Sequence, residues 1–157
     1  MKKFFAFTWA HALTGIAICT ILFAFTRPMG AHSVQVYLDK KLVVDQHLDF
    51  KGNAPKIKLA ANEKYNQLIV KYDECGRTVT GRKITVKDGD NKMLKAWYFK
   101  GSANGFGQPM EFQFNDILAL RQNGNNTLKL YYSSNDFPEG QQVASLVIGG
   151  NAVTASR

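Results

Sequence analysis

The chain has 157 residues and a formal net charge of +8, and 45% of its residues are hydrophobic. This length fits one domain after removal of any leader. Three histidines and two cysteines are too few for a zinc site with paired ligands, and they form no motif typical of a histidine-based hydrolase.

The first 31 residues are typical of an export signal. A positive head of two lysines precedes Phe4–Phe25, an uncharged and largely apolar run of 22 residues. This order predicts a signal peptide over residues 1–31 that is cleaved after Ala31. About 20 apolar residues also suffice to span a bilayer, so an uncleaved hydrophobic helix that anchors the chain is the alternative. In both cases the domain is expected outside the cytoplasm (periplasmic, secreted or at the cell surface), and only the N-terminal segment meets the membrane.

Cleavage after Ala31 would leave 17 basic and 12 acidic side chains, a net charge of +5. The lysines are spread along the sequence without clustered arginines, so nucleic acid is not an expected partner. Weak attraction to acidic polymers or to anionic envelope surfaces fits this charge. Because Cys19 lies in the leader, Cys75 has no disulfide partner within the domain, and we expect it to be a free thiol, buried or reactive, or to pair between chains.

From residue 32 onward the hydrophobic pattern has a period of two, which predicts β-strands. Val34, Val36 and Leu38 alternate with polar residues, and a polar break leads into a second strand that ends near Leu48. These two segments therefore read as a hairpin. Further strands are expected over residues 56–59, 67–72, 83–87, 93–99, 110–114, 127–133 and 143–148.

The connections between these strands carry their own signals. Asp88-Gly89-Asp90-Asn91 predicts a hairpin turn between two alternating segments, because glycine accepts the positive φ of tight turns. Asn115 or Asp116 is expected to cap a single helical turn that contains Ile117, Leu118 and Leu120. The stretch 149–157 has few large apolar residues and is expected to be a flexible tail.

Nine short strands separated by turns predict an all-β domain over residues 32–148. The expected architecture is an antiparallel β-sandwich with Greek-key connections, and an antiparallel β-barrel is the alternative. The alternation and the turns resemble those of exported sandwich modules of the immunoglobulin-like, jelly-roll-like and carbohydrate-binding types. This resemblance implies an architecture and no particular function.

Surplus aromatic side chains are the strongest candidates for binding. Neighbouring residues of a strand point to opposite faces, so Trp97-Tyr98-Phe99 and Tyr131-Tyr132 must each turn at least one ring away from the core. We expect Tyr37, Tyr98 and Tyr131 to face outward, where rings stack on sugars or anchor a partner protein. Cross-strand packing on the sheet surface is the alternative.

Two loops offer further candidates. Phe106, in the glycine-rich loop 101–109, either plugs one end of the domain or contacts a ligand. Asp88, Asp90 and Asn91 place three oxygen-bearing side chains in one turn, which makes them weak calcium candidates. The alternative is an ordinary hairpin turn, because lysines flank it and no glutamate follows at EF-hand spacing. No other metal and no cofactor is expected.

These observations favour an exported, non-enzymatic binding or interaction module with a protein or polysaccharide ligand. One alternative is a structural envelope subunit that assembles through strand edges or Cys75. Another is a small extracytoplasmic enzyme or inhibitor, for which two carboxylates would have to meet roughly 5–10 Å apart in a cleft. The ligand and the oligomeric state stay open at this stage.

Overall fold

The computed structural model describes residues 32–48, 53–60, 64–101, 108–121, 126–150 and 154–156. The chain divides into two compact units, Met1–Gly30 and Ala31–Arg157, and the description below concerns the second unit. The predicted signal peptide or anchor helix lies outside the described residues and stays a prediction. Within the described ranges, no helix has the length and apolar character needed to cross a membrane.

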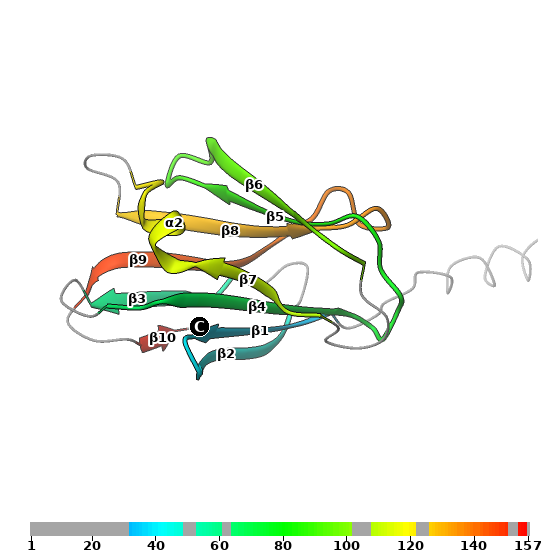
Figure 1. Ribbon diagram of the computed structural model, residues 1–157, viewed down its shortest axis with the longest axis horizontal. Helices are drawn as coiled ribbons and strands as arrows, with labels where there is room; N and C mark the ends of the chain where they lie inside the picture. The colour runs from blue at the N-terminus through cyan, green and yellow to red at the C-terminus, as the bar shows by residue number, and fades with distance from the viewer. Residues whose placement is uncertain are drawn as a thin grey trace, which may run out of the picture. The chain divides into compact units, whose positions relative to one another are not determined.

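The second unit is all-β, as predicted, with ten strands and one short helix among its described residues (Figure 1). The elements are β1 (His32–Leu38), β2 (Lys41–Leu48), β3 (Lys56–Ala60), β4 (Gln67–Glu74), β5 (Arg82–Lys87), β6 (Met93–Phe99), β7 (Met110–Gln113), α2 (Phe114–Leu118), β8 (Thr127–Ser133), β9 (Gln141–Gly150) and β10 (Thr154–Ser156).

The strands form two sheets. The four-stranded sheet has the order β2-β1-β4-β7, and all its neighbours are antiparallel. The six-stranded sheet has the order β10-β3-β9-β8-β5-β6, and its β3–β9 pair is parallel. The predicted alternative of a closed barrel is wrong, because each sheet ends in two edge strands and no ladder joins the sheets within the described residues.

Both predicted hairpins are confirmed. In the first, β1 pairs with β2 and Leu38 lies opposite Lys41. The turn residue Asp39 has a φ of 52°, and its carboxylate accepts the backbone N–H groups of Asn66 and Gln67. In the second hairpin, the Asp88 carboxylate accepts two backbone N–H groups of its own turn, both at 2.9 Å. Short polar side chains thus fix the turns that set strand register.

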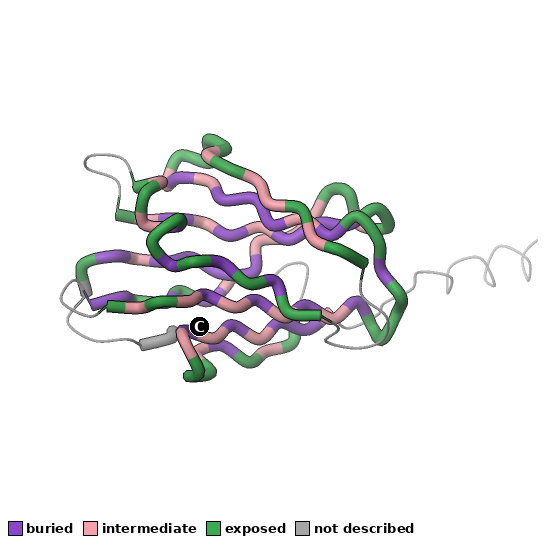
Figure 2. Tube along the Cα trace, viewed as in Figure 1, coloured by how far each residue is buried: buried purple, intermediate pink, exposed green. Residues whose placement is uncertain are grey.

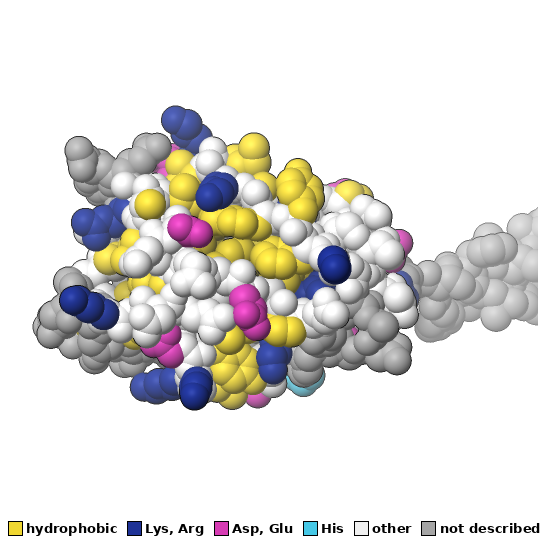
Figure 3. Space-filling model, viewed as in Figure 1, with side chains coloured by type: hydrophobic (Ala, Val, Ile, Leu, Met, Phe, Trp, Pro, Cys, Tyr) yellow, Lys and Arg dark blue, Asp and Glu magenta, His cyan; other side chains and the backbone are white. Residues whose placement is uncertain are grey.

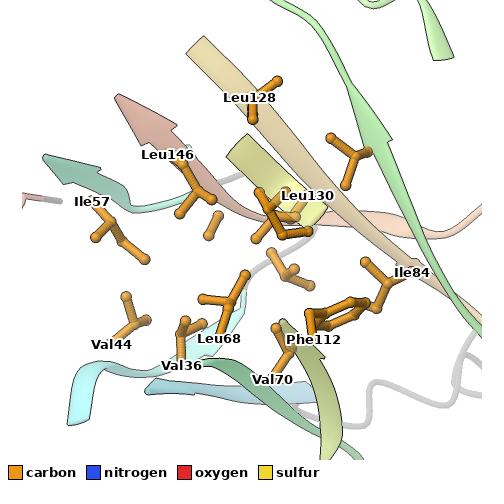
Figure 4. Packing of buried hydrophobic residues seen from close by; sticks show 14 of the residues in the cluster. Val36, Val44, Ile57, Leu68, Val70, Ile84, Phe112, Leu128, Leu130 and Leu146 are labelled. Carbon is orange, nitrogen blue, oxygen red and sulfur yellow. The ribbon is translucent and has the colours of Figure 1, made fainter. Parts of the chain in front are cut away.

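The core is one hydrophobic cluster to which both sheets contribute. Figure 2 shows buried and exposed residues alternating along the strands, as a period of two requires. In Figure 4, Val36, Leu68 and Val70 of the four-stranded sheet point toward residues of the six-stranded sheet, such as Leu130 and Leu146. Full burial of a side chain of this size contributes about 1.5–3 kcal/mol. The inward-facing positions expected from the sequence are confirmed.

Two details of the C-terminal half differ from the sequence-based expectation. The helical turn begins at Phe114, so the predicted caps Asn115 and Asp116 are wrong; the residue before it, Gln113, is extended and makes no side-chain cap. The Phe114 N–H instead donates to the Asn66 carbonyl at 2.8 Å, so a neighbouring loop replaces the cap. Within the stretch predicted to be a tail, β9 runs to Gly150 and β10 pairs with β3, which makes ten strands and not nine.

Candidate functional site

Two of the predicted aromatic residues lie on the outer face of the six-stranded sheet. Ile84 and Val86 of β5 are buried, so Lys83 before them and Lys87 after them face outward. The strand register then places the other outward residues. We call this surface the lysine face; it comprises Lys56 and Lys58 of β3, Lys83 and Lys87 of β5, Tyr98 of β6, and Lys129 and Tyr131 of β8.

Tyr98 is the most open ring on the lysine face. It is 78% exposed, the highest value among the large hydrophobic side chains that the structure describes. Its cross-strand neighbour is Lys83, so a phenol ring and an ammonium group stand side by side at the edge of the sheet. A ring with open sides is available for stacking on a flat ligand.

Tyr131 is held more firmly by its neighbours. Its hydroxyl donates to Gln142 Oε1 at 3.1 Å, and Gln142 Nε2 donates to Ser145 Oγ at 2.7 Å. The Lys87 ammonium lies 4.2 Å from the centre of the Tyr131 ring, a cation–π distance. One side of this ring is therefore covered by a lysine, and cross-strand packing describes Tyr131 better than it describes Tyr98.

The ammonium of Lys129 contacts the turn whose side chains Asp88, Asp90 and Asn91 are the weak calcium candidates. Its ammonium donates to the Gly89 carbonyl at 2.7 Å and to Asn91 Oδ1 at 2.8 Å. Asp88 is buried, and its carboxylate already accepts two backbone N–H groups. A calcium ion at this turn would have to displace a resident ammonium. The described residues contain no group of three His, Cys, Asp or Glu that could hold a metal ion.

The two sheets differ sharply in charge. The six strands of the larger sheet contain six lysines and one arginine and have no Asp or Glu. The four strands of the smaller sheet contain four acidic residues and two lysines. Sequence reasoning treated the lysines as spread out, because they are far apart along the chain. Lysines at the outward-facing positions of three predicted strands are the signal that could have revealed the lysine face.

The other predicted site residues are not part of this face. Tyr37 lies on the four-stranded sheet, where its hydroxyl donates to Gln35 Oε1 at 3.0 Å and the Lys71 ammonium lies 4.9 Å from its ring centre. The outer faces of two packed sheets point in opposite directions, so Tyr37 does not meet Tyr98. Phe106 lies outside the described residues. Cys75 is exposed in the turn after β4, with a φ of 57°.

A second polar cluster lies inside the domain, at the end of the sheets where β1 begins and β4 ends. His32 Nδ1 is 2.8 Å from the Tyr72 hydroxyl, and Tyr72 stacks on Tyr132 of the other sheet with 3.9 Å between ring centres. Burial raises the pKa of both tyrosines, and hydrogen bonding to Glu74 raises the pKa of Tyr132 further. Both phenols therefore stay protonated and can donate hydrogen bonds.

Sequence reasoning missed this cluster because Glu74 and Arg82 belong to different sheets. Both side chains are buried, and Glu74 Oε1 and Arg82 Nε have no hydrogen-bond partner among the described residues. The Arg82 guanidinium donates to the Gln108 carbonyl at 2.7 Å and to the Lys100 carbonyl at 3.4 Å. The cluster ties the two sheets together in the interior, whereas Lys56, Lys58 and Tyr98 of the lysine face are exposed.

The side of the molecule that carries β7 and α2 is different again. Figure 3 shows hydrophobic side chains gathered at the centre of this side and lysine or arginine side chains around its margin. Trp97 and Phe99 of β6 make edge-to-face contacts with Phe112 of β7, at 5.2 and 5.3 Å between ring centres. These aromatic contacts close the core between two edge strands.

Comparison with models of known protein families finds no match, and comparison with curated proteins finds no significant match either. The functional argument therefore depends on the geometry described above.

Proposed function

We propose that this chain is an exported, non-enzymatic binding module that holds a polysaccharide on the lysine face. The observation that carries the proposal is Tyr98, a phenol ring that is 78% exposed on a sheet surface. An aromatic ring that stays open to water at a cost in hydrophobic free energy is suited to stack on a sugar ring. The half-buried Tyr131 and the amide of Gln142 add polar groups on the same face, two and three strands away from Tyr98.

A non-enzymatic role is supported by the position of the perturbed groups. The described side chains with shifted pKa values, His32, Tyr72 and Tyr132, form the interior cluster and do not belong to the lysine face. Catalytic acids and bases need contact with a substrate. The lysine face presents an exposed aromatic ring and several ammonium groups, which suit the binding of a ligand without a chemical step.

We further propose a β-sandwich with Greek-key connections, preceded by a signal peptide that directs the domain outside the cytoplasm. The crossings of the chain between sheets after β2, β3, β4, β6 and α2 support this topology. The two N-terminal lysines and the apolar run after them support export. Loss of residues 1–31 from the exported chain, measured by mass spectrometry, is the expected outcome; an intact N-terminus would favour the membrane anchor.

The test of the binding surface compares two tyrosines on opposite sheets. Affinity electrophoresis in gels that contain dextran, xylan, polygalacturonate or heparin measures retardation of the wild type. For the polymer that binds, Tyr98→Ala should weaken affinity about tenfold, equivalent to about 1.4 kcal/mol of stacking. The matched control Tyr37→Ala should change it little. Equal effects of the two variants, or no retardation in any gel, would overturn the proposal.

A further inference from the structure

We infer that the polysaccharide bound by the lysine face is anionic, a polymer that carries carboxylate or sulfate groups along its length. This inference rests on the function proposed for the same face and adds the chemical class of the ligand. The supporting observations are the arrangement of the lysines, the absence of acidic residues from the strands that bear them, and the identity of the side chains between them.

The lysines form a row that crosses the strands. Lys87 of β5 lies opposite Lys129 of β8, Lys129 lies opposite Ser145 of β9, and Ser145 lies opposite Lys56 of β3. Neighbouring strands are about 4.8 Å apart, so these four positions extend over about 14 Å. A second exposed lysine, Lys58, lies two residues further along β3. This spacing suits a linear chain that presents negative groups at several points.

The strands that bear the row contain no acidic side chain, and the nearby Asp88 of the β5–β6 turn is buried, with its carboxylate accepting two backbone N–H groups. The strands β3, β5, β6, β8 and β9 contain no Asp or Glu. Like charges directly opposite each other in a sheet are destabilising, and Lys87 and Lys129 form such a pair. Their ammonium groups turn apart, one over the Tyr131 ring and one toward the Gly89 carbonyl. An anionic ligand would relieve this repulsion and gain from the summed field of the face.

The other groups on the face favour a polysaccharide over a nucleic acid. The arginine of this sheet, Arg82, is buried, so the planar fork that commonly holds phosphate is missing from the lysine face. Single strands of nucleic acid stack on several successive rings. Here one open ring, Tyr98, shares the face with the hydroxyl of Tyr131 and the amide of Gln142, which are half-buried and hydrogen-bonded to each other. Those groups match the hydroxyls of a sugar chain.

The test uses charge reversal on two matched pairs of exposed lysines. Lys56→Glu/Lys58→Glu alters the lysine face, and Lys40→Glu/Lys41→Glu alters the β1–β2 hairpin of the other sheet by the same total charge. Affinity for heparin, polygalacturonate and neutral dextran is measured by calorimetry at 50 and 200 mM salt. Circular dichroism and thermal unfolding show whether each variant keeps the wild-type fold.

The wild type should bind the two anionic polymers and bind them more weakly at higher salt. The Lys56→Glu/Lys58→Glu variant should lose affinity for them by about tenfold or more, while the hairpin variant keeps most of it. Equal losses in both variants would mean that net charge alone acts, and would overturn the inference. Equally tight binding of single-stranded DNA would overturn it too.

The outcomes separate this inference from the proposed function. If dextran or xylan binds as tightly as the anionic polymers and Tyr98→Ala abolishes that binding, the polysaccharide module stands and its anionic ligand is refuted. If no polymer binds, both are refuted.

Discussion

Arg82 is a buried arginine that holds the ends of a loop. It is 1% exposed, and its guanidinium donates to the carbonyl of Lys100, just after β6, and to that of Gln108, just before β7. These two residues flank the segment that contains Phe106. A buried charge is tolerated when it is hydrogen-bonded, and here the partners are backbone carbonyls that also need a donor. Arg82 thus anchors the connection between the two sheets.

His32 gives the interior cluster a dependence on pH. Its ring makes edge-to-face contacts with Tyr72 and Phe137, at 5.6 and 5.4 Å between centres. Burial is the largest influence on its pKa and lowers it, while Glu74 and Asp73 oppose that shift and Arg77 adds to it. The unfolded chain therefore takes up this proton at a higher pH than the folded domain does.

We predict that the free energy of unfolding falls as the pH drops below about 6.5, the ordinary histidine pKa, toward the lower pKa of folded His32. Urea unfolding at pH 7.5, 6.5 and 5.5 measures this loss. His32→Asn should flatten the pH profile over this range. His47→Asn removes an exposed histidine of β2 and is the control for loss of an imidazole. An unchanged slope in the His32 variant would contradict the prediction.

Among the elements, the edge strand β6 has a feature that discourages pairing with a strand of another molecule. Its register with β5 places Lys95 opposite Val86, on the side that faces the core, yet Lys95 is exposed. Its ammonium lies 4.7 Å from the Trp97 ring centre. A charge on the inward side of an edge strand discourages the addition of another apolar strand. This favours the face of the sheet, and not its edge, as the binding surface.

Two glycines in tight connections offer a matched test of backbone constraint. Gly140, just before β9, has a φ of 66°, and a Cβ there would collide with the Tyr132 carbonyl oxygen and lie 2.9 Å from Ser133 Cβ. Gly76 has a similar φ of 70°, but a Cβ there would meet nothing within 4 Å. Both positions favour glycine for conformation, and Gly140 alone of the two adds a collision with backbone.

We predict that Gly76→Ala costs about 1 kcal/mol of folding free energy, the strain of a left-handed conformation. Gly140→Ala should cost about 3 kcal/mol or more, because the carbonyl of a central strand cannot move aside easily. Chemical denaturation of the two variants measures the difference. Equal costs would mean that the β8–β9 connection relaxes freely, contrary to the packing described here.

The predicted elements were accurate where the local pattern was strong. The alternation around Val34, Leu68 and Leu128 placed strands and inward faces correctly, because a strand with one buried face must repeat every two residues. The helix cap and β10 were missed. The first depends on the Asn66 carbonyl, and the second on pairing with β3, both distant in sequence. No local signal encodes either partner.

At the scale of the whole molecule, the two sheets separate the charges of the domain. The strands of the larger sheet contain no acidic residue, and five of their seven basic residues lie on the outer face, whereas the strands of the smaller sheet contain four acidic residues and two lysines. A modest net charge therefore conceals one strongly positive face. Electrostatic attraction of a polyanion depends on this local field more than on the total.

A further prediction at this scale concerns the assembly of two chains through Cys75. The thiol is exposed in a turn, and the second cysteine of the sequence, Cys19, lies in the predicted leader. In an oxidising compartment we predict a dimer linked through Cys75. Size-exclusion chromatography should show it without reductant, and it should disappear with dithiothreitol and in Cys75→Ser. A monomer under all three conditions would reject disulfide assembly.

Local sequence patterns were enough to predict the all-β class, most strand positions and the two hairpins, because alternation and turn chemistry act between residues that are close along the chain. They also singled out Tyr98 and Tyr131 as rings that must leave the core. Only the tertiary structure decided that Lys56, Lys87 and Lys129 share one row and that Glu74 and Arg82 share one interior. The lysine row comes from strands paired across dozens of residues, and Glu74 meets Arg82 because their two sheets pack on each other; both depend on packing of the whole core.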